Sequence, residues 1–234
     1  MTQDDLAEKV LGRKEIYIMK KATGVNYLLL ALFAFGGLAL EFILSYGIEI
    51  LLYGMQMADW STLQWVLHWT LTCIVWGVVS YILIRFAKNK YDFDILAKGN
   101  KMKVWQWIIV VALIIGSLII SYMNWNGSKV LSEFQRNGLA RFIFQYIYYV
   151  FEILLVTLIL VFGQKAFEKW FKKENIPYGG IIIAITWGLA HFFTKEILTG
   201  VISVIAGLAF GSVYLLVNRD IKKTYLILWI MFVL

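Results

Sequence analysis

Residues 139–163 read LARFIFQYIYYVFEILLVTLILVFG, a run of 25 residues in which Arg141 and Glu152 are the only charged side chains. A helix needs about 20 predominantly apolar residues to cross the hydrocarbon core of a bilayer. This stretch is therefore long enough and apolar enough to span a membrane. It predicts a chain organised around membrane helices rather than around a soluble core.

The composition of the whole chain agrees with this interpretation. Of its 234 residues 61% are hydrophobic and 16% are charged, whereas a soluble domain has about 45–50% apolar and about 25% charged residues. One Pro and one Cys exclude collagen-like, proline-rich and disulfide-stabilised classes. Cys73 lies in an apolar run and is expected to be a packing residue. The predicted fold class is an all-α, polytopic helical membrane bundle.

Six further apolar stretches bring the expected number of membrane segments to about seven. We expect residues 1–26 to form a cytoplasmic N-terminal tail and residues 27–234 to form a single transmembrane helical domain. The fifth and the last segments are short for a full crossing. In order, the segments are Tyr27–Leu52, Leu63–Phe86, Val104–Tyr122, Leu139–Gly163, Gly179–Phe193, Ile197–Val217 and Tyr225–Leu234.

Basic residues alternate across these segments and predict their orientation. The tail and residues 85–103, 165–173 and 219–223 hold 18 of the 22 Lys and Arg residues. Lys and Arg are enriched in cytoplasmic loops because they orient insertion, so the N-terminus is expected in the cytoplasm. The same rule accounts for the net charge of +7, and no nucleic-acid partner is expected. The partner implied by the composition is the lipid bilayer.

Five carboxylate or imidazole side chains lie within the predicted spans: Glu41, Glu49, His68, Glu152 and His191. Each costs roughly 2.5–3.5 kcal/mol on insertion scales, which makes each a candidate for function. Glu49 lies near an outer boundary and is interpreted as a wetted carboxylate. His68, near the start of its span, is interpreted as a hydrogen-bonded imidazole.

Glu152 and His191 are predicted to lie at the same depth. Glu152 is 11 residues from the inner end of its span, and His191 is 12 residues into the next one. At about 1.5 Å per residue, both lie roughly 16–18 Å from the cytoplasmic face. A buried carboxylate beside an imidazole can orient a water molecule and take its proton. The alternative is a structural Glu–His hydrogen bond between two helices. Glu41 has a similar depth and is a candidate third member of this polar cluster.

Other motifs are few. Glu and His ligands without HExxH spacing give little support to a metal site, so no cofactor is expected and a metal ion stays an open alternative. Gly207 and Gly211 form a GxxxG motif. We expect it to allow close helix packing within the bundle rather than dimerisation.

Two short segments carry a resemblance to a known family. Phe151–Val156 reads FEILLV, Trp187–His191 reads WGLAH, and a Gly-rich span, a basic turn and a last helix follow. In these features the core at about residues 139–234 resembles the CPBP (Abi) family. This family comprises CAAX proteases and bacteriocin-processing proteins, intramembrane glutamic endopeptidases related to the eukaryotic type II CAAX prenyl protease.

The chain keeps one of the family's three motifs in full. The aromatic-xxx-His motif is present at residues 187–191. The first motif, EExxxR, has Phe151 in place of one Glu and Val156 in place of the Arg. The third motif, HxxxN, would fall on Leu228 and Phe232.

The resemblance implies an intramembrane endopeptidase in the bacterial plasma membrane. Glu152 and His191 would be its catalytic residues, Trp187 would occupy a motif position, and the substrate would be a membrane-embedded or prenylated peptide. The incomplete motifs leave open a non-catalytic relative that acts in bacteriocin self-immunity or binds a membrane protein partner. A transporter or channel would need more intramembrane polar residues than this chain has.

Overall fold

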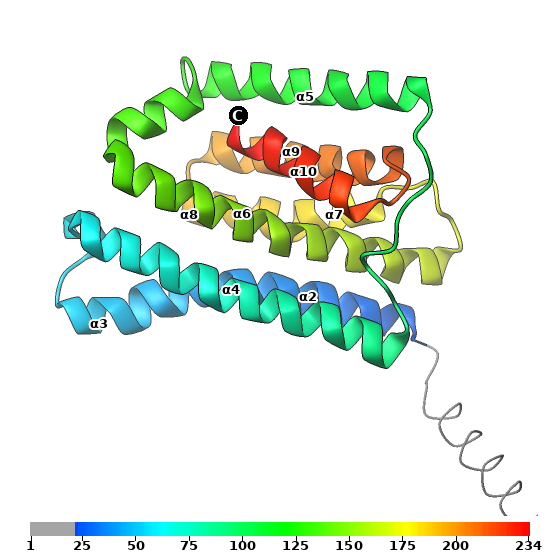
Figure 1. The fold of residues 1–234 in the computed structure, drawn as a ribbon, viewed down its shortest axis with the longest axis horizontal. Helices are drawn as coiled ribbons and strands as arrows, with labels where there is room; N and C mark the ends of the chain where they lie inside the picture. Colours follow the sequence, from blue (N-terminus) through cyan, green and yellow to red (C-terminus); the bar gives the residue numbers. More distant parts are fainter. Residues whose placement is uncertain (1–21) are drawn as a thin grey trace, which may run out of the picture.

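The computed structural model describes residues 22–234, and all regular elements in this range are helices (Figure 1). The first long helix, Gly24–Tyr53, consists of α2 (Gly24–Phe42), the π-helix η1 (Ile43–Glu49) and α3 (Ile50–Tyr53). It and four others are long and apolar enough to cross a membrane. The other four are α4 (Thr62–Tyr91), α5 (Val104–Asn124), α6 (Lys129–Phe171) and α9 (Ile197–Leu216).

Two further helices are shorter. α7 (Tyr178–Ile183), the π-helix η3 (Ala184–Gly188) and α8 (Leu189–Thr194) form one apolar helix, and α10 (Ile221–Val233) has 13 residues. The 3₁₀-helix η2 (Met57–Asp59) lies between α3 and α4. The prediction of an all-α fold is therefore confirmed for the described residues, five of whose helices are long and apolar enough to cross a membrane. The predicted tail, residues 1–26, lies mostly outside them.

Polar residues begin three of the long helices. Thr23 and Ser61 each form a capping box, with Asn26 and Gln64 respectively, at the starts of α2 and α4. Ser128 accepts a hydrogen bond from the backbone N–H of Leu131 at the start of α6. Such caps satisfy backbone N–H groups that have no partner within the helix.

Helix α6 is the centre of the bundle. It packs against α2, α4, α7 and α10, and Figure 1 shows it running between these helices. Between Ile153 and Phe162 almost every side chain is buried, including Leu155, Val156 and Leu158, which have no exposed surface. A helix that is apolar all round is found in the core of a large protein or within a membrane, and this part of α6 is enclosed by other helices. This explains why the apolar run at 139–163 determines the fold.

The GxxxG motif packs inside the bundle, as expected. A Cβ atom added to Gly211 would lie 2.5 Å from the Cα atom of Gly180 in α7, and one added to Gly207 would lie 2.9 Å from the backbone nitrogen of Ala184. The backbones of α7 and α9 therefore approach too closely for any larger residue at these positions.

Helix α6 begins earlier than predicted and contains a kink. The predicted span started at Leu139, but the helix starts at Lys129 and bends at Gly138, whose φ is 68° and ψ 173°. This conformation is unfavourable for residues with a Cβ atom. The kink folds residues 129–137 back over the outer part of α6, with consequences for the polar residues described below.

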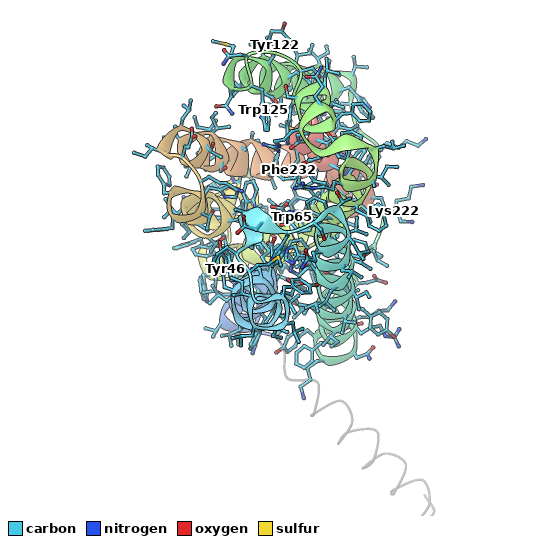
Figure 2. The ribbon with its side chains drawn as sticks, turned by 90° about the vertical axis from the view of Figure 1, so that its left-hand side faces the viewer. Tyr46, Trp65, Tyr122, Trp125, Lys222 and Phe232 are labelled. Carbon is cyan, nitrogen blue, oxygen red and sulfur yellow. The ribbon has the colours of Figure 1, made fainter. Side chains whose placement is uncertain are left out.

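The two ends of the bundle differ in charge. Helices α4, α6 and α9 end, and α5, α7 and α10 begin, at the right-hand end in Figure 1. The basic residues at 85–103, 165–173 and 219–223 belong to the segments at this end. The opposite end holds α3 and the start of α6, and Figure 2 views the molecule from it.

Candidate functional site

Each of the two π-helices accompanies a group of polar residues. Glu41 lies just before η1 and Glu49 is its last residue, whereas Trp187 lies in η3 and His191 follows it closely. A π-helix widens the turn, changes the direction of the side chains that follow, and is frequent at functional sites. The π-helices therefore mark two of the four helices that carry the candidate residues; His68 and Glu152 lie in α4 and α6.

Trp187 connects the two predicted catalytic residues. Its indole Nε1 donates a hydrogen bond to Glu152 Oε1 at 3.1 Å, and its backbone carbonyl oxygen is 2.7 Å from Nδ1 of His191. Both Trp187 and Glu152 are buried, and His191 is half-buried. A carbonyl oxygen can only accept, so Nδ1 carries the hydrogen. In the neutral ring Nε2 is then free to accept a proton.

Glu152 and His191 are thus brought to the same residue but not to each other. Among residues 22–234, no hydrogen bond joins the two side chains directly. The imidazole instead packs edge-on against the Trp187 indole, with ring centroids 4.4 Å apart. Two acceptors, the free carboxylate oxygen of Glu152 and Nε2 of His191, remain available to a water molecule or a substrate.

A lysine that the sequence did not single out lies beside this pair. Nζ of Lys129 donates to the backbone carbonyl of Phe232 at 2.5 Å and lies 4.7 Å and 5.1 Å from the ring centroids of Phe232 and Tyr149. The Phe232 ring is in turn 5.9 Å from the Trp187 ring. The ammonium group is close enough to Glu152 for their charges to attract. Figure 2 shows Phe232 near the middle of this end of the bundle.

The kink at Gly138 is what brings Lys129 to this position. The nearby Glu133 accepts a hydrogen bond from the Tyr149 hydroxyl at 2.7 Å, although the two residues are 16 positions apart in one helix. A straight helix would separate them by about 24 Å. The amide of Gln145 also donates to the Tyr149 hydroxyl, at 2.6 Å.

The positions of the incomplete family motifs are apolar and packed. Val156 and Leu228, where the resemblance expects Arg and His, have no exposed surface and lie in the core. Phe232, where it expects Asn, contacts Trp187 and Lys129. Only the last of these positions faces the predicted site.

A second polar group surrounds His68. Its Nδ1 is 2.6 Å from Glu49 Oε2, and its Nε2 is 3.5 Å from Glu41 Oε1. The hydroxyl of Tyr148 donates to the other oxygen of Glu41 at 2.9 Å. Glu41 therefore contacts His68 and Tyr148 rather than His191, while its charge is still close enough to act on Glu152.

The interpretation of Glu49 as a wetted boundary carboxylate is wrong. Glu49 is only 2% exposed, because η1 directs it toward the bundle. The prediction that His68 is a hydrogen-bonded imidazole is confirmed. One signal could have paired them: Glu49 and His68 lie near the two helix ends that a short connection joins, so their depths match.

No group of three or more His, Cys, Asp or Glu side chains within residues 22–234 is arranged to hold a metal ion. In the His68 group the two carboxylates lie at different nitrogens of one imidazole ring. A single ion could not bind both nitrogens.

Comparison with known proteins adds no further guide to the site. No family model, no curated protein and no solved structure matches this chain.

Proposed function

We propose that this protein is a CPBP-like intramembrane endopeptidase that hydrolyses a peptide bond of a membrane-embedded or prenylated peptide. The observation that carries the proposal is that Trp187 binds Glu152 through its indole and His191 through its backbone carbonyl. This arrangement places a carboxylate and an unoccupied imidazole nitrogen on two sides of one rigid residue. No cofactor enters the proposed step.

In the proposed reaction Glu152 is the general base. It takes a proton from water while the water oxygen bonds to the substrate carbonyl carbon, and His191 Nε2 orients the water by accepting its other hydrogen. Lys129 would stabilise the negative charge that develops on the carbonyl oxygen. Glu152 then returns its proton to the leaving nitrogen as the C–N bond breaks. Lys129 thereby supplies a cation next to Phe232, one of the positions at which the family's third motif is absent.

The proposed orientation follows from the basic residues. With the positively charged end of the bundle in the cytoplasm, the N-terminus is cytoplasmic and all seven apolar segments belong to the membrane domain. The candidate site then lies in the outer half of the bilayer. The bacterial plasma membrane is the proposed location.

One observation favours a second function, a non-catalytic protein of bacteriocin self-immunity or a binding partner of another membrane protein. Val156 and Leu228 are fully buried apolar residues at motif positions. Glu152 already has a hydrogen-bond partner in Trp187. These features would also suit a bundle that has lost catalysis and retains a structural polar pair.

The test uses the full chain in liposomes with a pool of membrane-embedded and farnesylated peptides, whose cleavage is followed by mass spectrometry. We expect the wild type to cleave a subset of peptides, and Glu152→Gln and His191→Asn to abolish cleavage at unchanged protein levels. Glu174→Gln is the matched control, because that side chain is 78% exposed at the opposite end. If the wild type cleaves nothing and both site variants keep the cellular phenotype, the endopeptidase proposal is rejected in favour of the second function.

A further inference from the structure

We propose that Glu49, His68 and Glu41 form a proton-binding site within the bundle, separate from Glu152 and His191. The imidazole lies between two carboxylates, with Nδ1 at 2.6 Å from Glu49 and Nε2 at 3.5 Å from Glu41. The site's ligand is a proton, held on the imidazole and released toward Glu41. None of these three residues takes part in the proposed hydrolysis, so this inference stands independently of it.

The positions of the two carboxylates indicate how many protons the two ring nitrogens of His68 carry. A neutral imidazole has one N–H donor and one acceptor nitrogen, whereas the imidazolium has two donors. A carboxylate accepts hydrogen bonds, and an acceptor nitrogen facing it would be repelled. Both nitrogens of His68 face carboxylate oxygens. With both carboxylates ionised, the arrangement is attractive on both sides only when each nitrogen carries a proton.

The enclosure of His68 makes this requirement strong. The side chain has no exposed surface, and its Nε2 has no hydrogen bond of ordinary length. A buried polar atom without a partner is destabilising, and more so when charged groups are involved. A proton on Nε2 turns an unpartnered atom facing a carboxylate into one half of an ion pair.

The surrounding groups leave one direction for proton exchange. Glu49 is buried, whereas 26% of the Glu41 side chain is exposed. Tyr148 of α6 donates to Glu41 and leaves the oxygen that faces His68 free. The Arg141 guanidinium faces this region from α6, 5.1 Å from the centroid of the Trp65 ring, which packs on the imidazole.

The proton step is balanced in atoms and charge. The loaded site contains two carboxylates and one imidazolium and carries a net charge of −1. On release, the Nε2–H bond breaks and an O–H bond forms on Glu41, and the imidazole keeps its Nδ1 proton toward Glu49. Loss of the proton from Glu41 to water leaves a net charge of −2. Glu41 also lies close enough to Glu152 for their charges to act on each other.

The test exploits the presence of only two histidines in the chain. His191→Asn leaves His68 as the only imidazole, whose two ring nitrogens can be followed by ¹⁵N NMR of the full chain in nanodiscs. We expect both nitrogens to be protonated at pH 7, and Nε2 to lose its proton before Nδ1 as the pH rises. Glu41→Gln is expected to abolish the Nε2 proton at pH 7, and the exposed Glu174→Gln to leave both protons in place.

If His191→Asn does not fold, the same signals follow from subtracting the spectrum of His68→Asn from that of the wild type. A singly protonated His68 at pH 7 that is unchanged by Glu41→Gln would overturn the proposal. His68 would then be only a structural hydrogen-bond partner of Glu49. Since no substrate enters this measurement, its result is distinguishable from success or failure of the cleavage assay.

Discussion

The indole nitrogen of Trp187 and the carboxylate of Glu152 are joined by a buried hydrogen bond of 3.1 Å, across 35 positions of sequence. This bond ties the carboxylate to the helix that carries His191. Trp187→Phe keeps an aromatic ring but removes the donor, and should lower the free energy of unfolding by about 1–3 kcal/mol, because the carboxylate is left buried and unpaired. Denaturant unfolding in mixed micelles measures this change.

Trp229 provides the matched control for this substitution. Its indole nitrogen is buried and has no partner. Trp229→Phe removes no hydrogen bond and should change stability less than Trp187→Phe does. Equal losses in the two variants would show that ring volume, not the bond to Glu152, determines the effect.

Replacement of Lys129 tests the proposed role of its charge. Lys129→Met should reduce kcat by about 10²–10³-fold, the effect of removing one donor to a developing oxyanion, with a smaller change in KM. Lys165→Met is the control, since its ammonium lies 5.8 Å from the Phe93 ring centroid at the other end of the bundle. An unchanged kcat in a folded Lys129→Met protein would remove Lys129 from the mechanism.

Because the backbones of α7 and α9 approach closely, we expect one methyl group added at Gly211 to lower stability. In Gly211→Ala the new Cβ would lie 2.5 Å from the Cα atom of Gly180, so the two backbones must separate. We expect a loss of about 1–3 kcal/mol in stability, the usual cost of overpacking. Gly116→Ala in α5 meets nothing within 4 Å and should be neutral or stabilising by up to about 1 kcal/mol.

The environment of Asp220 predicts that stability depends on pH at the basic end of the bundle. Burial opposes its charge, but hydrogen bonds from the ammonium and the backbone N–H of Lys223 outweigh burial and hold its pKa below the ordinary value. The stabilisation is therefore present above the unfolded-state pKa of about 4 and is lost as the pH falls through the folded-state pKa.

Asp220→Asn keeps a capping oxygen but loses the charge. It should cost about 1 kcal/mol at pH 7, and this difference from the wild type should disappear once the pH is below the folded-state pKa of Asp220. Asp94→Asn breaks an exposed pair with Lys88 and should have little effect at any pH. A difference that persists undiminished in acid would exclude the Asp220 charge as its cause.

The proposed orientation can be tested by labelling. The single cysteine, Cys73, is buried, so Cys73→Ser provides a background for new cysteines. With an impermeant maleimide on intact cells, Met55→Cys should react and Lys222→Cys should react only after permeabilisation. The reverse pattern would place the N-terminus outside. Both side chains are exposed, at opposite ends of the bundle.

The sequence predicted the helices well and their ends less well. Each of the seven apolar stretches corresponds to helical structure, because about 20 apolar residues can be accommodated in a bilayer only as a helix. Residues 129–137 escaped notice because they are helical but polar. Hydropathy marks the residues that are apolar enough to lie in a bilayer, and a helix can extend beyond them. It also gives no sign of the kink at Gly138.

Counting residues along the predicted spans placed Glu152 and His191 at one depth, and in the structure each of them contacts Trp187. Counting gives no information on which side of its helix a residue lies. Glu41 was expected beside His191 but contacts His68. Lys129 could not be found without knowledge of the kink.

The contact between Lys129 and Phe232 also determines when the site can exist. Phe232 lies in α10, and Ser117 and Ser121 of α5 likewise bind backbone carbonyls of that helix end, those of Met231 and Leu234. During synthesis Lys129, Glu152, Trp187 and His191 are all made before α10. A nascent chain therefore carries Lys129 without the Phe232 carbonyl and ring that hold its ammonium group, and the arrangement is completed only when α10 has been made.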